Sequence, residues 1–432
     1  MERGLVPILR GNPAVYRTWR IACPAIAERC FAMLVTMIDT KMVSGLGTAA
    51  IAAVAITTQP RLIYLAPFEA VSLVVSIMVS QSIGAKQNGQ ARQAVSLGIW
   101  VCLLSAILAT AACVLLADEV LLLTGADSVI LESAAAYFRI LMVGHLFHVE
   151  SLLINASLRG AGMTKSVFYS GLAANLTNVC FNYILIEGRC GFPRLEVAGA
   201  ALASLLGMAV GLAVSAAFLM KEDCVLNLRR KTEVQMTAVW RPMLSLSWNT
   251  LQENLFKRIG MFLYGLMVAK IGIAALAAHQ IGVNFTNLSF AIGDGIANAA
   301  CTLVGQSAGA DSSEDVQRYG GICHMFGTGI GSAIAGIYIL FARQLFGLFV
   351  PEEEVLRYAE PLMTITAMEA FLEIVQVTTA GCLRGLGDLQ AVTRISFVSI
   401  TLIRPVPSVF AVRRKHLYAA FAAELVWGRF PV

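Results

Sequence analysis

Residues 79–85 have the sequence Val-Ser-Gln-Ser-Ile-Gly-Ala, and residues 304–310, 225 positions later, have the sequence Val-Gly-Gln-Ser-Ala-Gly-Ala. The same offset places Leu-Arg-Gly-Ala-Gly at 158–162 over Leu-Arg-Gly-Leu-Gly at 383–387. A third segment, which begins at Met42, matches the second half of the chain at this offset as well. Because three separate motifs share one offset, we interpret the chain as an internal duplication.

The sequence around these motifs is strongly apolar. Apolar side chains make up 57% of the 432 residues and charged ones 14%, and the mean hydropathy is +0.73. These values exclude an ordinary soluble domain. Eleven apolar runs are long enough to cross a bilayer and a twelfth is short: 21–41, 52–80, 94–117, 130–155, 166–187, 197–220, 243–269, 274–304, 321–341, 357–382, 391–412 and 417–427.

We therefore predict an all-α integral membrane protein of two parallel six-helix bundles. An even number of spans returns each half to the same side, so the halves are related by a pseudo-twofold axis along the membrane normal. The longest polar stretch separates them. It gives an N-terminal lobe at 1–222, a cytoplasmic linker loop at 223–241 and a C-terminal lobe at 242–432.

The distribution of Lys and Arg sets the orientation. With a cytoplasmic N-terminus, sixteen of these residues near span ends fall on the cytoplasmic side and six on the other. The positive-inside rule then predicts a multi-pass protein of the plasma membrane with its N-terminus in the cytoplasm.

The end of the chain departs from the repeat. The run 417–427 covers only about half of a bilayer core, and Arg413, Arg414 and Lys415 precede it on the side that the positive-inside rule disfavours. We expect a truncated twelfth helix, an incompletely closed C-terminal lobe, and lower stability and weak or absent transport compared with a full-length relative.

Several classes of function are disfavoured. The length leaves no room for a soluble catalytic domain, so we do not expect an enzyme. The ten cysteines are scattered without a C-x-x-C pair, which argues against a disulfide framework or a metal site. The net charge of +5 follows membrane topology, so we expect no nucleic-acid partner and no cofactor.

Several motifs together resemble the multidrug and toxic compound extrusion (MATE) family. They run in order from Pro-Ala-Ile-Ala-Glu at 24–28 through Asp-Thr-Lys-Met-Val-Ser-Gly-Leu-Gly at 39–47, the 79–86 loop, the 158–165 connection, Asn-Val-Cys-Phe-Asn at 178–182, Gly-Ala-Ala-Leu-Ala-Ser at 199–204 and Ala-Ala-His-Gln at 277–280. The resemblance spans about residues 15–404. It implies a twelve-helix antiporter that exports amphiphilic cations against a proton or sodium gradient.

Asp39 is the main candidate for coupling to that gradient. An acid inside a membrane span is a functional candidate by default, and the repeat mate of Asp39 is Tyr264, so only the first half carries this acid. The resemblance matches Asp39 to the family's coupling aspartate. The alternative is an interfacial acid that pairs with Lys41 or caps a helix.

Asn178 and Asn182, one helical turn apart, share a helix face. The resemblance places them, with the hydroxyl of Ser204, in one polar site with the first-helix aspartate. The second amide position is often aspartate in the family, so Asn182 leaves open whether the coupling ion is H+ or Na+. Alternatively, these groups only hold helices together.

Seven further residues are candidates for the substrate cavity. Three pairs are repeat mates: Glu28 with Glu253, Glu69 with Asp294, and His148 with Glu373, while His145 and Glu369 lie one turn earlier on the helices of His148 and Glu373. Acids at two equivalent places equally suit an architectural role, and Glu253 could pair with Lys257 one turn later. The predicted cavity set is Glu28, Glu69, His148, Glu253, Asp294, Glu369 and Glu373.

The sequence thus predicts a monomeric, cation-coupled antiporter in membrane lipid that exports small amphiphilic cations by alternating access. One alternative is a flippase for a lipid-linked precursor, which has the same two-lobe plan but would need a strongly cationic cavity. Another is a channel or receptor, which has no need of a parallel duplication with one asymmetric acid.

Overall fold

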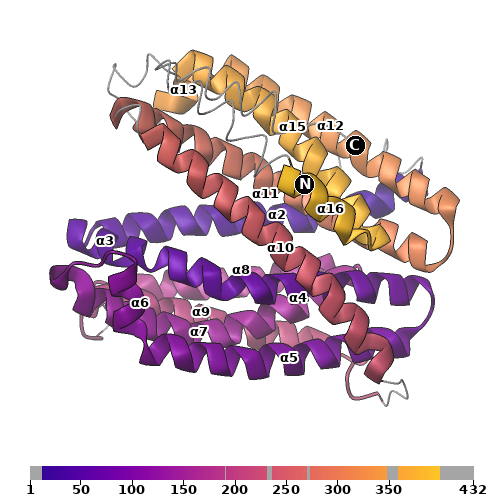
Figure 1. Cartoon of the computed structure of the whole chain (residues 1–432), viewed down its shortest axis with the longest axis horizontal. Helices are drawn as coiled ribbons and strands as arrows, with labels where there is room; N and C mark the ends of the chain where they lie inside the picture. The colour runs from indigo at the N-terminus through magenta and orange to yellow at the C-terminus, as the bar shows by residue number, and fades with distance from the viewer. Residues whose placement is uncertain (1–11, 190, 231–235, 270–272, 348–358, 399–432) are drawn as a thin grey trace. The chain divides into compact units, whose positions relative to one another are not determined.

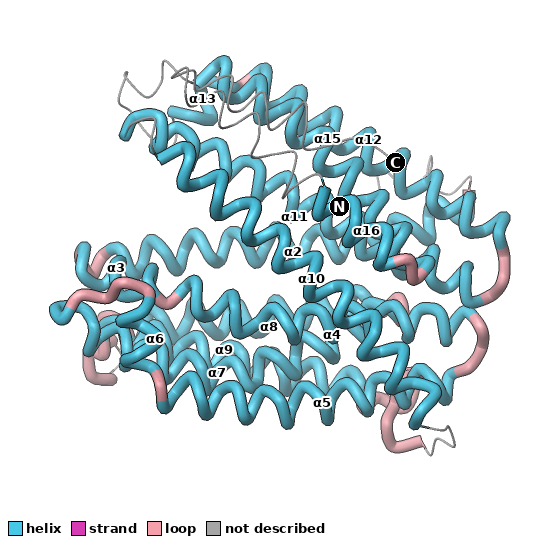
Figure 2. The backbone as a smooth tube through the Cα atoms, in the orientation of Figure 1, coloured by secondary structure: helices cyan, strands magenta, loops and turns pink. Residues whose placement is uncertain are grey.

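The computed structural model describes residues 12–189, 191–230, 236–269, 273–347 and 359–398. In these ranges the chain forms helices and no β-strand (Figures 1 and 2). The helices are α2 (Pro13–Ser44), α3 (Thr48–Ile56), α4 (Thr58–Gly84), α5 (Asn88–Leu115), α6 (Ala117–Leu123), α7 (Ser128–Gly160), α8 (Thr164–Leu185), α9 (Glu196–Leu219), α10 (Met236–Ala269), α11 (Ile273–Gly309), α12 (Ser313–Leu340), α13 (Ala342–Gly347), α15 (Ala359–Leu386) and α16 (Leu389–Ser396).

The length and composition of these helices suit a membrane. Eight helical segments of the described ranges are long and apolar enough to cross a bilayer. Large apolar side chains also lie exposed on them, such as Leu108 at 72% and Leu115 at 78% of the full accessible surface. A lipid environment covers such side chains without cost, so the prediction of an all-α integral membrane fold is confirmed.

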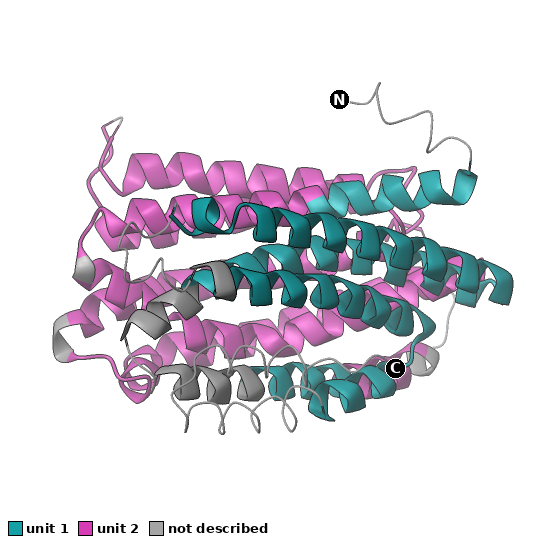
Figure 3. Cartoon of the chain, turned by 90° about the horizontal axis from the view of Figure 1, so that it is seen from above, with its two compact units in different colours: residues 1–26, 248–432 teal, residues 27–247 magenta. Residues whose placement is uncertain are grey.

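The chain divides into two compact units, coloured separately in Figure 3. Unit 1 contains residues 1–26 and 248–432, and unit 2 contains residues 27–247. Each boundary falls inside a long helix, the first in α2 and the second in α10. The lobes inferred from the repeat stay a prediction, and the short run at 417–427 lies outside the described residues.

In unit 2, α7 packs against α4, α5 and α9, and α8 packs along α9. Leu141 of α7, Ala201 of α9 and Ile186, which directly follows α8, form part of one buried core. Small residues permit this close packing. A Cβ added to Gly207 of α9 would lie 2.7 Å from the carbonyl oxygen of Ala174 on α8, so only glycine fits there.

In unit 1, α11 packs along α15, and α12 packs on both. Phe285, Phe346 and Leu362 belong to one buried core. A second core joins the start of α2, through Ile21 and Ala22, to Leu303 of α11. The first turns of the chain's first membrane helix are therefore part of unit 1.

The repeated Leu-Arg-Gly motif has the same geometry in both units. A Cβ on Gly160 would lie 2.4 Å from the carbonyl oxygen of Ser76, and one on its repeat mate Gly385 would lie 2.8 Å from that of Cys301. Ser76 and Cys301 are themselves 225 positions apart. The first glycine of the motif thus lets two helices pack with their backbones in contact.

The second glycine of the motif ends the helix. Gly162, after α7, has φ of 80°, and Gly387, after α15, has φ of 85°. Both positions are left-handed, a conformation that glycine adopts without steric cost and that commonly terminates helices. The duplication inferred from the sequence is therefore repeated in the backbone.

Candidate functional site

The polar site predicted around Asp39 is assembled within unit 2. Asp39 lies near the end of α2, Asn178 and Asn182 lie on α8, and Ser204 lies on α9. The two amides are buried, with 8% and 2% of their surface exposed. Asn178 lies where α8 and α9 approach closely at Gly207. A Cβ added to Gly207 would be only 3.0 Å from the Cβ of Asn178.

The carboxylate of Asp39 accepts hydrogen bonds from both amides. Asn182 donates from Nδ2 to Asp39 Oδ1 at 2.7 Å. With the amide of Asn178 turned so that its nitrogen faces the carboxylate and its oxygen faces Ser204, the nitrogen donates to Asp39 Oδ1 at 2.9 Å and to Oδ2 at 3.0 Å. The oxygen of Asn178 then accepts from the backbone N–H of Ser204 at 3.2 Å and from its hydroxyl at 3.1 Å.

This arrangement can respond to a proton or a metal cation. An amide carries both donors and an acceptor, so it can donate to an ionised carboxylate or accept from a protonated one. Oδ1 of Asn182 is buried without a hydrogen-bond partner among the described residues. An oxygen in that state, next to a carboxylate, is a ligand that hard cations prefer.

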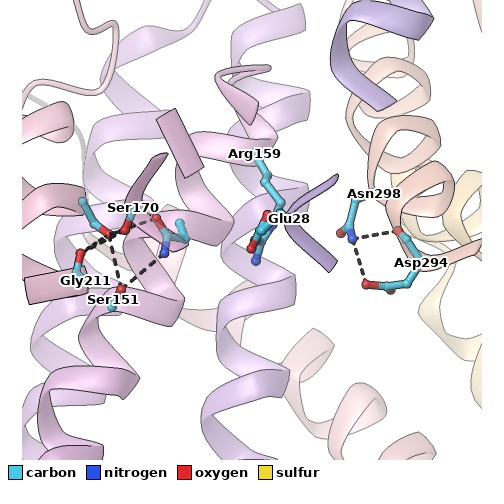
Figure 4. Close-up of polar contacts among 9 residues, drawn as sticks. Glu28, Ser151, Arg159, Ser170, Gly211, Asp294 and Asn298 are labelled. Carbon is cyan, nitrogen blue, oxygen red and sulfur yellow. Dashed lines mark hydrogen bonds and ion pairs between the residues drawn. The ribbon is translucent and has the colours of Figure 1, made fainter. Parts of the chain in front are cut away.

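Two of the predicted cavity acids form equivalent ion pairs with the arginine of the repeated motif. Glu28 of α2 lies 3.5 Å from Arg159 of α7. Figure 4 shows the two side chains next to each other. Its repeat mate Glu253 of α10 lies 2.7 Å from Arg384 of α15 and also contacts Lys257. Glu253 is fully buried. A carboxylate and an arginine therefore join α2 to α7 in unit 2, and in the same way join α10 to α15 in unit 1.

Two other acids of the predicted cavity set in unit 1, Asp294 and Glu369, have local polar partners. Asn298, one turn further along α11, donates to the carboxylate of Asp294 at 3.1 Å (Figure 4). Thr286 of α11 donates to Glu369 of α15 at 3.3 Å. Glu373 lies one turn after Glu369 on α15. Whether these groups meet substrate stays a prediction.

In unit 2, His148 belongs to an aromatic cluster. The rings of His145 and His148 lie 5.7 Å apart, and His145 packs edge-on against Tyr64 of α4 at 5.8 Å. Arg61, also on α4, lies within electrostatic range of both histidines. Glu69 is half-buried and lies about two turns after Arg61 on α4. That Glu69 and His148 contact substrate stays a prediction.

Sequence reasoning missed two features of these units. The partners of Glu28 and Glu253 are the arginines of the Leu-Arg-Gly motif, which the sequence alone identifies only as a repeat. Glu150 of α7, only 7% exposed, was not singled out at all, although it is an acid within an apolar run. That position was the available signal, since acids inside membrane spans are rare.

The fold and the site together define a duplicated helical membrane protein with one asymmetric carboxylate site. The sequence model of the MatE family matches residues 24–184 and 251–410, one segment in each half. Because these segments cover most of the chain, the chain belongs to the MatE family.

Two relatives cover nearly the full length. The chain is 26% identical over 389 residues to the probable multidrug resistance protein NorM of Thermotoga maritima, covering 89% of this chain and 83% of that protein. It is 26% identical over 391 residues to the multidrug resistance protein MdtK of Yersinia pseudotuberculosis, covering 89% and 84%.

Solved structures share the fold. A MOP superfamily transporter from Pyrococcus furiosus, described with a binding pocket of reversed polarity, superposes with a TM-score of 0.87 at 21% identity, covering 98% of this chain and 94% of that one. A MATE protein crystallised in a bent conformation gives a TM-score of 0.84 at 21% identity, with the same coverage.

Proposed function

We propose that the chain is a cation-coupled antiporter that exports amphiphilic organic cations by alternating access. The observation that carries the proposal is the Asp39 site, where an acid inside a membrane helix accepts from Asn182 at 2.7 Å and lies beside Asn178 and Ser204. Placing a charge in a bilayer costs about 2.5–3.5 kcal/mol on insertion scales, so such an acid suits a functional role.

Asp39 changes its hydrogen-bonding requirement when it binds an ion, and the amides can follow. An ionised carboxylate needs the N–H donors of Asn178 and Asn182, whereas a protonated one needs an acceptor. A rotation of either amide supplies that acceptor. A sodium ion would instead take the carboxylate, the free Oδ1 of Asn182 and the hydroxyl of Ser204 as oxygen ligands. Ion binding would thereby rearrange contacts between α2, α8 and α9.

The proposed substrates follow from the acids and from the relatives. NorM and MdtK are named as multidrug resistance proteins. Among the predicted cavity residues, Glu28, Glu253 and Asp294 have polar or cationic partners within their own unit, while Glu369 has a hydroxyl partner. The cationic partners of Glu28 and Glu253 offset their charge. Carboxylates that accept from neutral groups, as Asp294 does from Asn298 and Glu369 from Thr286, favour organic cations over anions and disfavour the lipid-linked precursor of the alternative flippase.

The experiment uses purified protein in liposomes loaded with a fluorescent organic cation. A proton gradient and a sodium gradient are imposed separately, and efflux is followed with and without an ionophore that collapses the gradient. We expect one gradient to drive efflux that the ionophore abolishes. Efflux that neither gradient accelerates would contradict cation coupling, and gradient-independent movement of a labelled lipid-linked precursor would favour the flippase.

A further inference from the structure

Three helices of unit 2 meet at Gly98 of α5. A Cβ added there would lie 3.0 Å from Cγ2 of Val75 on α4 and 3.2 Å from both Cδ atoms of Leu153 on α7. Val75, Gly98 and Leu153 therefore form one tightly packed layer across α4, α5 and α7.

The next layer along these helices contains three polar groups. A short turn joins α4 to α5, and α6 leads from α5 into α7, so α4 and α7 run in one direction and α5 in the opposite one. One turn before Val75 is Ser72, one turn after Gly98 is Cys102, and one turn before Leu153 is Glu150. Because α5 runs opposite to α4 and α7, Ser72, Cys102 and Glu150 all lie on the same side of the layer formed by Val75, Gly98 and Leu153. Cys102 lies within electrostatic range of Glu150, as this placement requires.

The layer is buried and its polar groups are incompletely satisfied. Glu150 is 7% exposed, Ser72 is 2% exposed and Cys102 is fully buried. Neither Oε1 of Glu150 nor Oγ of Ser72 has a hydrogen-bond partner within the described part of the chain. Two other acids of unit 2 differ, since Glu28 pairs with Arg159 and Asp118 with Arg139.

The neighbouring helices bring few charges to this layer. Besides Cys102, α5 carries Arg92 and Cys113, and α4 carries Glu69 one turn beyond Ser72, with Arg61 and Tyr64 further along. The sole acid of α9 is Glu196, at its first residue, and α3 has no titratable group. Two further elements pack against α7. Their titratable groups are Asp118 and Glu119 of α6, and Lys165, Tyr169, Cys180 and Tyr183 of α8. The other titratable groups of α7 itself are Glu132, Tyr137, Arg139, His145, His148 and Arg159.

We propose that Glu150 is a second proton-binding carboxyl of unit 2, and that its proton holds α4, α5 and α7 packed together. A carboxylate buried without a cation is unfavourable, whereas the neutral acid can remain in the layer and supplies an O–H donor. Loss of the proton to water leaves an ion that must be hydrated, which requires these helices to separate. This inference does not depend on coupling at Asp39.

The first test measures the melting temperature of the purified full chain in detergent between pH 5 and pH 8. The packed form binds a proton that the unfolded chain releases, so stability falls as pH rises. For a chain of 432 residues, one such proton corresponds to a shift of about 1.5 °C per pH unit. Glu150→Gln should remove this part of the slope, while Glu132→Gln, an exposed acid of the same helix, should keep it. Equal slopes in all three proteins would overturn the proposal.

The second test records the infrared carbonyl band of protonated carboxyl groups as pH is changed. We expect a band that Glu150→Gln lacks and Glu132→Gln retains. Should Glu150→Gln fail to fold, Glu150→Asp keeps an acid and should keep the pH-dependent slope while moving the band to a different frequency. A band that Glu150→Asp leaves unmoved belongs to another residue and would equally overturn the assignment.

Discussion

At the scale of single residues, the two halves hold the same ion pair with unequal strength. Within the described part of the chain, Glu28 has one cationic partner, Arg159 at 3.5 Å, and its side chain is 18% exposed. Glu253 has two, Arg384 at 2.7 Å and Lys257, and its side chain is fully buried. A buried acid with two cations is costly to remove, because both cations then remain without their counter-charge.

Glu253→Gln should therefore destabilise the protein more than Glu28→Gln does. Breaking a buried pair from one side typically costs about 3–5 kcal/mol, and the looser, partly exposed pair at Glu28 should cost less. The melting temperatures of the two variants in detergent make the comparison. Equal losses would show that the second cation and the deeper burial at Glu253 carry no extra stability.

The residue scale also separates what the sequence could and could not predict about the site. Helical spacing predicts that Asn178 and Asn182 share a face, and the family resemblance predicts that Asp39 and Ser204 join them. The structure brings the four residues together. The unpaired state of Glu150 could not be predicted. Whether an acid has a partner depends on contacts between helices, which the periodicity of one helix does not contain.

At the scale of helices, the contact between α2 and α11 within unit 1 depends on a single glycine. A Cβ on Gly295 would lie 2.8 Å from the backbone nitrogen and Cα of Ile26. Backbone atoms cannot move aside as the end of a side chain can. Gly295 therefore allows the first half of α2 to pack on α11.

Gly295→Ala should force these two helices apart. Overpacking of this kind costs about 1–3 kcal/mol, so we expect a lower melting temperature and slower substrate exchange. Gly320→Ala on α12 is the matched control, because an added Cβ there meets nothing within 4 Å and alanine favours helix. A melting temperature unchanged by Gly295→Ala would show that α2 and α11 are not in close contact.

Apolar runs predict the positions of helices such as α5 and α9, but they do not predict that the first turns of α2 belong to unit 1. Apolar length alone locates spans such as α5 and α9, since a bilayer imposes that length. The start of α2 belongs with unit 1 because Ile21, Ala22 and Leu303 form one core. Side chains buried against a distant helix look the same in the sequence as those facing lipid, because both are apolar.

At the scale of the whole molecule, the bias of Lys and Arg predicts that the N-terminus and the loop near residue 230 are cytoplasmic. An added cysteine at Arg230 should then resist an impermeant thiol reagent in intact cells, and one at Thr124 should react. Both are compared with the parent protein, whose native cysteines set the background. Labelling at position 230 in intact cells would reverse the proposed orientation.

The most direct test of coupling at Asp39 compares Asp39→Asn with wild type in gradient-driven efflux from liposomes. Asparagine keeps the size and hydrogen bonding of the side chain but cannot bind or release a proton and carries no charge for sodium. The account predicts that Asp39→Asn inserts and folds but loses gradient-driven efflux, while Asp118→Asn, which removes a half-exposed acid paired with Arg139, retains it. Efflux by Asp39→Asn at the wild-type rate would contradict the account.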